Sequence, residues 1–134
     1  MGRILAIDYG LRRTGLAWTD PQQNVALPLE GVETAQLWQK IEQLLGEVEK
    51  IVIGYPRRLD GRPTEMTAPV ERLYHQLRQK YPTISIELVE ERLSTHAATH
   101  YLRQLPRKVR QDKAAADRIA ATILLENYLL RKKP

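Results

Sequence analysis

The chain contains no cysteine and no long hydrophobic run. Without cysteine it can form no disulfide and no thiolate metal site, and it has no thiol nucleophile. Any catalysis must therefore use oxygen and nitrogen groups, among which carboxylates are the first candidates. No apolar run approaches the ~20 residues that a bilayer span requires. The apolar stretch near the N-terminus is too short for the hydrophobic region of a secretory signal. We expect a cytoplasmic protein with no membrane partner.

The composition is that of an ordinary globular domain with an excess of positive charge. The 134 residues are 43% hydrophobic and 28% charged, and the formal net charge is +5. No repeat, low-complexity tract or linker divides the sequence, so we predict a single domain over residues 1–134. The excess of Lys and Arg favours a polyanionic partner, because cations that neutralise phosphates release condensed counterions. The oligomeric state stays open between a monomer and a weak homodimer.

Many of the basic residues gather in loops, which is typical of a surface that binds a nucleic-acid backbone. One group lies in the turn "GLRRTG", a second follows the apolar run "IVIGYP", and a third precedes the last helical stretch. The predicted nucleic-acid contacts are Arg12, Arg13, Arg57, Arg58, Arg107, Lys108, Arg110 and Lys113.

Hydrophobic patterning predicts three strands, followed by alternating helices and strands. Turns with Gly, Pro and Asn separate strands at 3–9, 15–19 and 25–32, as in an antiparallel meander. A helical stripe begins at Thr34, a candidate cap, and extends to Val48. Later strands are predicted at 50–56 and 83–92, and later helices at 66–81, 95–105 and 113–130. The predicted fold class is α/β: a mixed sheet, an antiparallel meander and then parallel strands, with helices on both faces.

Acidic residues stand at three places where the pattern predicts burial. Asp8 lies in the first apolar strand, and Glu90 and Glu91 end the strand at 83–92, at the carboxyl edge where ligand sites of open α/β sheets lie. Asp117 shares one helical stripe with apolar residues such as Leu124, so it should face the sheet. Each acid has an ordinary alternative, a turn cap or an ion pair with a nearby Arg or Lys.

Taken together, the three acidic positions favour a metal site. Carboxylates that meet at one place repel one another by a few kcal/mol per pair at ~4 Å and an effective dielectric near 20. A bound cation would compensate for this repulsion. Hard oxygen ligands that leave room for water and substrate suit Mg²⁺ or Mn²⁺ better than Zn²⁺.

Four blocks of the sequence resemble the YqgF family, also called RuvX, of ribonuclease H-like bacterial nucleases. The blocks are "AIDYGLRRTGLAWTD", "IVIGYPRRLDG", "EERLST" and "DKAAADRIAATILLENYL", in the order of the family and over nearly the whole chain. The resemblance implies a ribonuclease H-like fold, a nuclease site with divalent metal, and a role in trimming the 5′ end of precursor 16S ribosomal RNA. Relatedness to the RuvC Holliday-junction resolvases implies branched DNA as the competing substrate.

The resemblance also implies the catalytic and metal-binding residues: Asp8 from the first strand, Glu91 from the strand end and Asp117 from the helix. The family usually has Asp-Glu-Arg where this chain has Glu90, Glu91 and Arg92. Alternation along the strand puts Glu90 on the face of the apolar residues before it, so Glu90 remains the alternative ligand. The resolvase relatives carry a further acid near the helical aspartate, whereas Asp117 has none within the next turn.

Two other classes of function stay open at this stage. The chain could be a nucleic-acid-binding ribosome-assembly factor with a weak catalytic site, in which the basic loops matter and the acids do not. The stretch "DYGLRRTG" also resembles the phosphate loop of the actin and hexokinase superfamily. That superfamily clamps a nucleotide between two such lobes, and 134 residues supply only one.

Overall fold

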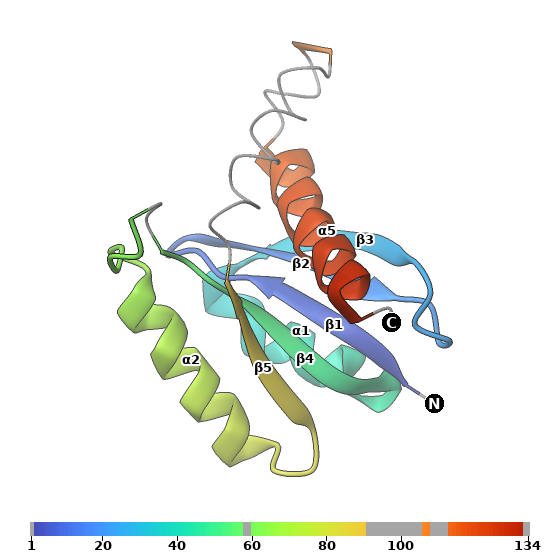
Figure 1. The fold of residues 1–134 in the computed structure, drawn as a ribbon. Coiled ribbons are helices and arrows are strands. Elements are labelled where there is room, and N and C mark those ends of the chain that lie inside the picture. Colours follow the sequence, from blue (N-terminus) through green and yellow to red (C-terminus); the bar gives the residue numbers. More distant parts are fainter. Residues whose placement is uncertain (1, 58–59, 91–105, 108–112, 133–134) are drawn as a thin grey trace.

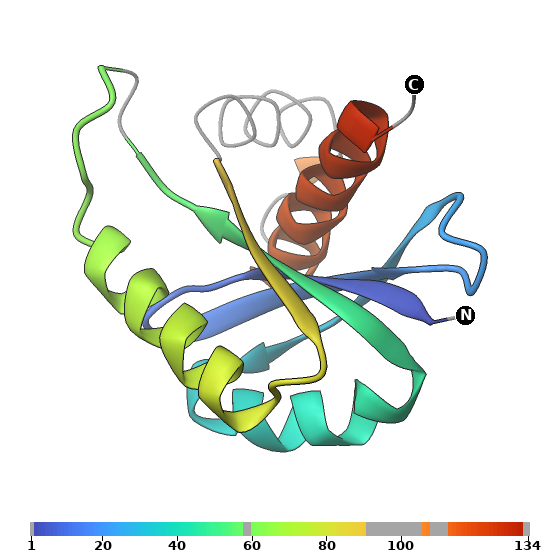
Figure 2. The same ribbon diagram turned by 60° about the horizontal axis from the view of Figure 1, so that its bottom comes forward.

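A computed structural model shows a five-stranded sheet with helices on both faces (Figures 1 and 2). The structure describes residues 2–57, 60–90, 106–107 and 113–132. The strand order is β3-β2-β1-β4-β5. β1, β2 and β3 pair antiparallel, whereas β4 pairs parallel with β1 and with β5. The predicted fold class, an antiparallel meander followed by parallel strands, is confirmed.

The elements follow the predicted order with small shifts at their ends. The strands are β1 (Arg3–Asp8), β2 (Arg13–Thr19), β3 (Ala26–Glu33), β4 (Val48–Tyr55) and β5 (Ser85–Glu90). The helices within the described residues are the 3₁₀ turns η1 (Thr34–Gln36) and η2 (Leu45–Glu47) and the α-helices α1 (Leu37–Leu44), α2 (Thr67–Lys80) and α5 (Lys113–Lys132). No described helix is both long enough and apolar enough to cross a bilayer.

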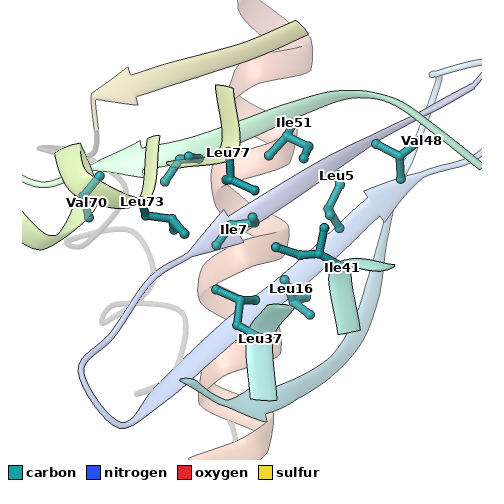
Figure 3. Close-up of a cluster of buried hydrophobic side chains, with 11 residues drawn as sticks. Leu5, Ile7, Leu16, Leu37, Ile41, Val48, Ile51, Val70, Leu73 and Leu77 are labelled. Carbon is teal, nitrogen blue, oxygen red and sulfur yellow. The ribbon is translucent and has the colours of Figure 1, made fainter. Parts of the chain in front are cut away.

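The first hydrophobic core lies between the sheet and the helices α1 and α2 (Figure 3). Residues at alternate positions of β1 and β4 point into it, because side chains alternate between the two faces of a strand. Its fully buried members include Leu5 and Ile7 from β1, Ile41 from α1 and Leu77 from α2. Burial of each such side chain contributes about 1.5–3 kcal/mol, so this core fixes β1, β4 and both helices as one unit.

The second core lies on the opposite face, beneath α5. Ile4 and Ala6 of β1 contribute to it, and from α5 it takes Ala121, Leu124 and Tyr128. These three residues follow Asp117 at i+4, i+7 and i+11, on the helical stripe that was predicted to face the sheet. The face of β1 that carries Ile4 and Ala6 also carries Asp8, since all three are at even positions.

Two local predictions differ from the structure. The helix predicted to run from Thr34 to Val48 is broken into η1, α1 and η2, and Val48 begins β4, where it is buried in the first core. Thr34 does not cap a helix through its side chain. Its hydroxyl instead donates a hydrogen bond of 2.6 Å to the Gly10 carbonyl oxygen. The helix predicted at 95–105 lies outside the described residues.

Candidate active site

Asp8 is the last residue of β1, at the edge where β1, β4 and β5 all end. It lies on the α5 face and is partly buried. Its antiparallel partner on β2 is Gly15. On the other side, Ile7 pairs with Ile53, so Gly54 comes next along β4 beside Asp8. Asp8 is therefore flanked by glycines on both neighbouring strands.

Asp117 lies on α5 directly above this part of the sheet. A Cβ atom at position 15 would overlap the carbonyl oxygen of Asp117, and one at position 31 would lie 3.2 Å from its Cβ. The backbone of α5 therefore rests on Gly15, the residue that pairs with Asp8. Two residues 109 positions apart in the sequence, Asp8 and Asp117, thus lie on the same face of the sheet, on either side of one glycine.

The carboxylate of Asp117 is turned toward β2 and β3. The Nε–H of Arg13, the first residue of β2, donates a hydrogen bond of 2.8 Å to its Oδ2. That oxygen also lies 3.4 Å from the position of a Cβ at Gly31 on β3. The side chain of Arg13 is 38% exposed and that of Asp117 is 25% exposed. Arg13 was predicted to contact nucleic acid, and here it is the ion-pair partner of a predicted catalytic residue.

The turn between β1 and β2 is held in one shape by Thr34. Its hydroxyl donates to the Gly10 carbonyl oxygen, and its backbone N–H donates to the Arg12 carbonyl oxygen at 2.9 Å. A Cβ at Gly10 would overlap the Arg13 carbonyl oxygen, so this turn requires glycine there. Arg12 points out of this fixed turn and is exposed.

The structure distinguishes the two faces at the end of β5. Glu90 pairs with Tyr55 in the register of β4 and β5, so the two side chains lie on the same face of the sheet. The Tyr55 hydroxyl donates a hydrogen bond to Glu71 of α2. Glu90 therefore lies on the α2 face, opposite to Asp8, and it is 3.8 Å from Arg57 Nε. The α5 face of β5 carries Glu87 and Val89 instead. Arg57, a predicted nucleic-acid contact, also donates a hydrogen bond to the Gly61 carbonyl oxygen at 3.0 Å.

The remaining predicted site residues are described only in part. Arg107 is exposed, and Lys113 begins α5. No group of three His, Cys, Asp or Glu residues able to hold a metal ion occurs within the described ranges. The predicted site residues that lie outside the described ranges are Arg58, Glu91, Lys108 and Arg110.

Asp8 and Asp117 together suit a small hard cation. Both offer carboxylate oxygens, the donors that Mg²⁺ and Mn²⁺ prefer. The chemistry of these two donors therefore suits a divalent ion that keeps several waters.

The family model "RuvX: Holliday junction resolvase" matches residues 2–131. The chain belongs to the RuvX family. Two curated relatives are both named "Putative pre-16S rRNA nuclease", and the match covers 99% of the length of each. The protein from Phocaeicola vulgatus is 41% identical over 99% of this chain, and the one from Flavobacterium psychrophilum is 39% identical over 98%. The family resemblance inferred from the four sequence blocks is thereby confirmed.

Solved structures of RuvC share the fold of this RuvX chain. RuvC of T. thermophilus in complex with a Holliday junction substrate has a TM-score of 0.54, covering 98% of this chain and 97% of that chain at 15% identity. A second Thermus thermophilus RuvC structure has a TM-score of 0.55 at 12% identity, over 96% and 95% of the two chains. This likeness supports the ribonuclease H-like architecture.

Sequence reasoning missed the parts of this RuvX site that act through the backbone. Gly31 and Thr34 carry no chemistry of their own and stand in no charged cluster. Gly15 stands in the sequence as the last residue of the turn "GLRRTG", whereas in the structure it makes room for α5. A signal was present, because a glycine inside a strand often marks a close approach of another backbone.

Gly15→Ala is expected to destabilise the protein by about 2–3 kcal/mol, because the new methyl group would meet the rigid backbone of α5. Gly46→Ala is the matched control, since nothing lies within 4 Å of a Cβ at that position. The control should change stability by less than about 0.5 kcal/mol. Urea unfolding of both variants measures the difference. Equal stabilities would show that α5 does not press on β2 at Gly15.

Proposed function

We propose that this chain is a nuclease that hydrolyses phosphodiester bonds with the help of Mg²⁺ or Mn²⁺, acting at the 5′ end of precursor 16S rRNA. The observation that carries the proposal is the placement of Asp8 and Asp117 on one face of the sheet, on either side of Gly15. The names of the relatives support the choice of substrate. Asp8, Glu91 and Asp117 are the proposed ligands of the ion.

The choice of Glu91 over Glu90 rests on the faces of β5. Glu90 lies on the α2 face near Arg57, away from Asp8. The α5 face of β5 carries Glu87 and Val89 instead. The family pattern places its ligand at the position of Glu91, so the proposal assigns the third carboxylate to Glu91.

The carboxylates of Asp8, Glu91 and Asp117 would hold the divalent ion. When bound, it would supply activation of a water and stabilisation of the leaving oxygen of a phosphodiester. The rigid turn between β1 and β2 presents the exposed Arg12 beside this site, where its guanidinium can hold a backbone phosphate. Basic residues that precede α5, among them the exposed Arg107, would extend the track for the nucleic-acid backbone.

The proposal is tested by incubating the purified protein, with Mg²⁺ or Mn²⁺, with three labelled substrates. These are precursor 16S rRNA, an unrelated single-stranded RNA and a four-way DNA junction. Metal-dependent cleavage near the 5′ end of the precursor is the expected result. Preferential cleavage of the junction would favour a resolvase instead, the activity named by the family model. Tight binding without cleavage of any of the three would favour a ribosome-assembly factor.

Simultaneous replacement of Arg107, Lys108 and Arg110 by Gln is expected to weaken RNA binding at all sequences alike. It should also flatten the salt dependence, by about 0.7 in the slope of log K against log[salt] for each lost phosphate contact on a single strand. Replacement of Arg72, Arg78 and Lys80 by Gln is the matched control, because these exposed cations lie on α2, which packs on the opposite face of the sheet from α5. RNA binding of both triple variants is measured across a salt series. The prediction is contradicted if both keep the wild-type slope of log K against log[salt].

A further inference from the structure

The contact between Arg13 and Asp117 raises a question that the nuclease proposal does not answer. Asp117 is a proposed metal ligand, yet one of its oxygens accepts a hydrogen bond from a guanidinium that is always charged. A divalent cation and this guanidinium would compete for the same carboxylate. The inference below rests on the metal-binding role proposed for Asp117.

The direction of the Asp117 side chain shows which partner it has in this structure. Its Oδ2 lies over β2 and β3, near Arg13 and Gly31. Asp8 is on β1, and two strand spacings, about 10 Å, separate β1 from β3. An ion held by both Asp8 and Asp117 would lie nearer to β1 than this oxygen does, so Oδ2 can ligate such an ion only if Asp117 turns away from Arg13.

The backbone around Asp117 allows this turn without any change of fold. Packing of α5 on Gly15 fixes the Cα and carbonyl group of Asp117, independently of where its carboxylate points. Arg13 is likewise fixed through its backbone, by the pairing of β2 with Glu33 on β3. Only the two side chains need to move, and both are partly exposed to water.

We propose that Arg13 is an exchangeable counterion of Asp117: it neutralises this carboxylate in the metal-free protein and is displaced from it when the divalent ion binds. Arg13 thus lowers the affinity for the ion, both by occupying a ligand oxygen and by placing a positive charge near the ion. Once displaced, its guanidinium becomes available to a backbone phosphate, a good acceptor for the planar fork of arginine. This sequence of contacts reconciles the ion pair with the predicted role of Arg13 in binding nucleic acid.

Calorimetric titration of the protein with Mn²⁺ alone tests the proposal. Arg13→Gln is expected to bind Mn²⁺ about tenfold more tightly than the wild type. The same variant should unfold at a lower temperature without metal, because the partly buried Asp117 loses its counterion. A merely structural role for Arg13 would lower both the stability and the affinity, so the opposite signs distinguish the two roles.

Two further variants complete the experiment. Arg12→Gln removes the same charge from the neighbouring exposed position and is expected to change the affinity by less than about threefold, since water screens it. Arg13→Lys keeps the charge and should return the affinity toward the wild-type value. The proposal would be overturned if Arg13→Gln bound Mn²⁺ no more tightly than the wild type. It would also be overturned if Arg12→Gln or Arg13→Lys gained as much Mn²⁺ affinity as Arg13→Gln.

The failure of this proposal is distinguishable from failure of the proposed function. If the wild type binds Mn²⁺ and Asp8→Asn does not, the metal site stands, and the behaviour of Arg13→Gln alone decides the role of Arg13. If the wild type binds no Mn²⁺, or if Asp8→Asn binds it equally well, the proposed metal site is wrong and the role of Arg13 falls with it.

Discussion

Glu91→Gln is expected to reduce cleavage by at least about two orders of magnitude, whereas Glu90→Gln should reduce it less than about tenfold. Gln keeps the shape and much of the hydrogen bonding of Glu but removes the charge that holds a divalent ion. The adjacent position provides the control, since Glu90 lies on the α2 face, 3.8 Å from Arg57 Nε. Loss of Glu90 therefore weakens a partly exposed ion pair and leaves the α5 face unchanged.

Single-turnover cleavage rates of the two variants, measured side by side under saturating Mn²⁺, give this comparison. Saturating metal matters, because a weaker ligand set would otherwise lower the rate through occupancy alone. The reverse ranking would assign the third ligand to Glu90 and would require the end of β5 to twist away from α2. Near-wild-type rates for both variants would remove this strand from the catalytic site altogether.

Asp8→Asn is expected to abolish cleavage, with a loss of about a thousandfold or more, and to leave the fold intact. Asn is similar in size to Asp, so the substitution adds no bulk at the end of β1. The chain offers a matched control in Asp20, which lies just beyond the end of β2 that is farthest from Asp8 and binds the backbone N–H groups of Asn24 and Val25. Asp20→Asn removes the same charge and should cleave at close to the wild-type rate.

The two aspartate variants also separate catalysis from folding. Circular dichroism and the melting temperature without metal should show that Asp8→Asn remains folded. An Asp8→Asn protein that cleaves at more than about a tenth of the wild-type rate would contradict a catalytic role for Asp8. Equal losses in Asp8→Asn and Asp20→Asn would point to a general effect of negative charge on the protein instead.

The sequence predicted the fold well because its elements have clear periodicities. The apolar run of β1 and the stripe of α5 identify buried segments and the acids within them, Asp8 and Asp117. That both acids lie on one face of the sheet follows only from the structure. The helix predicted to reach Val48 was wrong because short apolar runs fit a helix and a strand equally well. Pairing with Arg3 on β1 decides for a strand at Val48.

The site was less predictable than the fold, because its geometry depends on contacts between distant segments. The register that pairs Asp8 with Gly15, and the approach of α5 to that glycine, arise only when the sheet and the helix pack together. The ion pair between Arg13 and Asp117 spans 104 positions and leaves no mark in the local sequence. A cluster of basic residues predicts a nucleic-acid surface in general, but it cannot separate Arg12, which is exposed, from Arg13, which is paired within the chain.

The central claim, that Asp8 and Asp117 share a divalent ion, is tested most directly by the melting temperature during titration with Mn²⁺. A ligand that binds only the folded state stabilises it by mass action, about 2.7 kcal/mol at a hundredfold excess over Kd, or roughly 8 °C for a domain of this size. We predict such a rise for the wild type and for Asp20→Asn, and none for Asp8→Asn. An undiminished rise in Asp8→Asn would show that the ion binds elsewhere and would contradict the account.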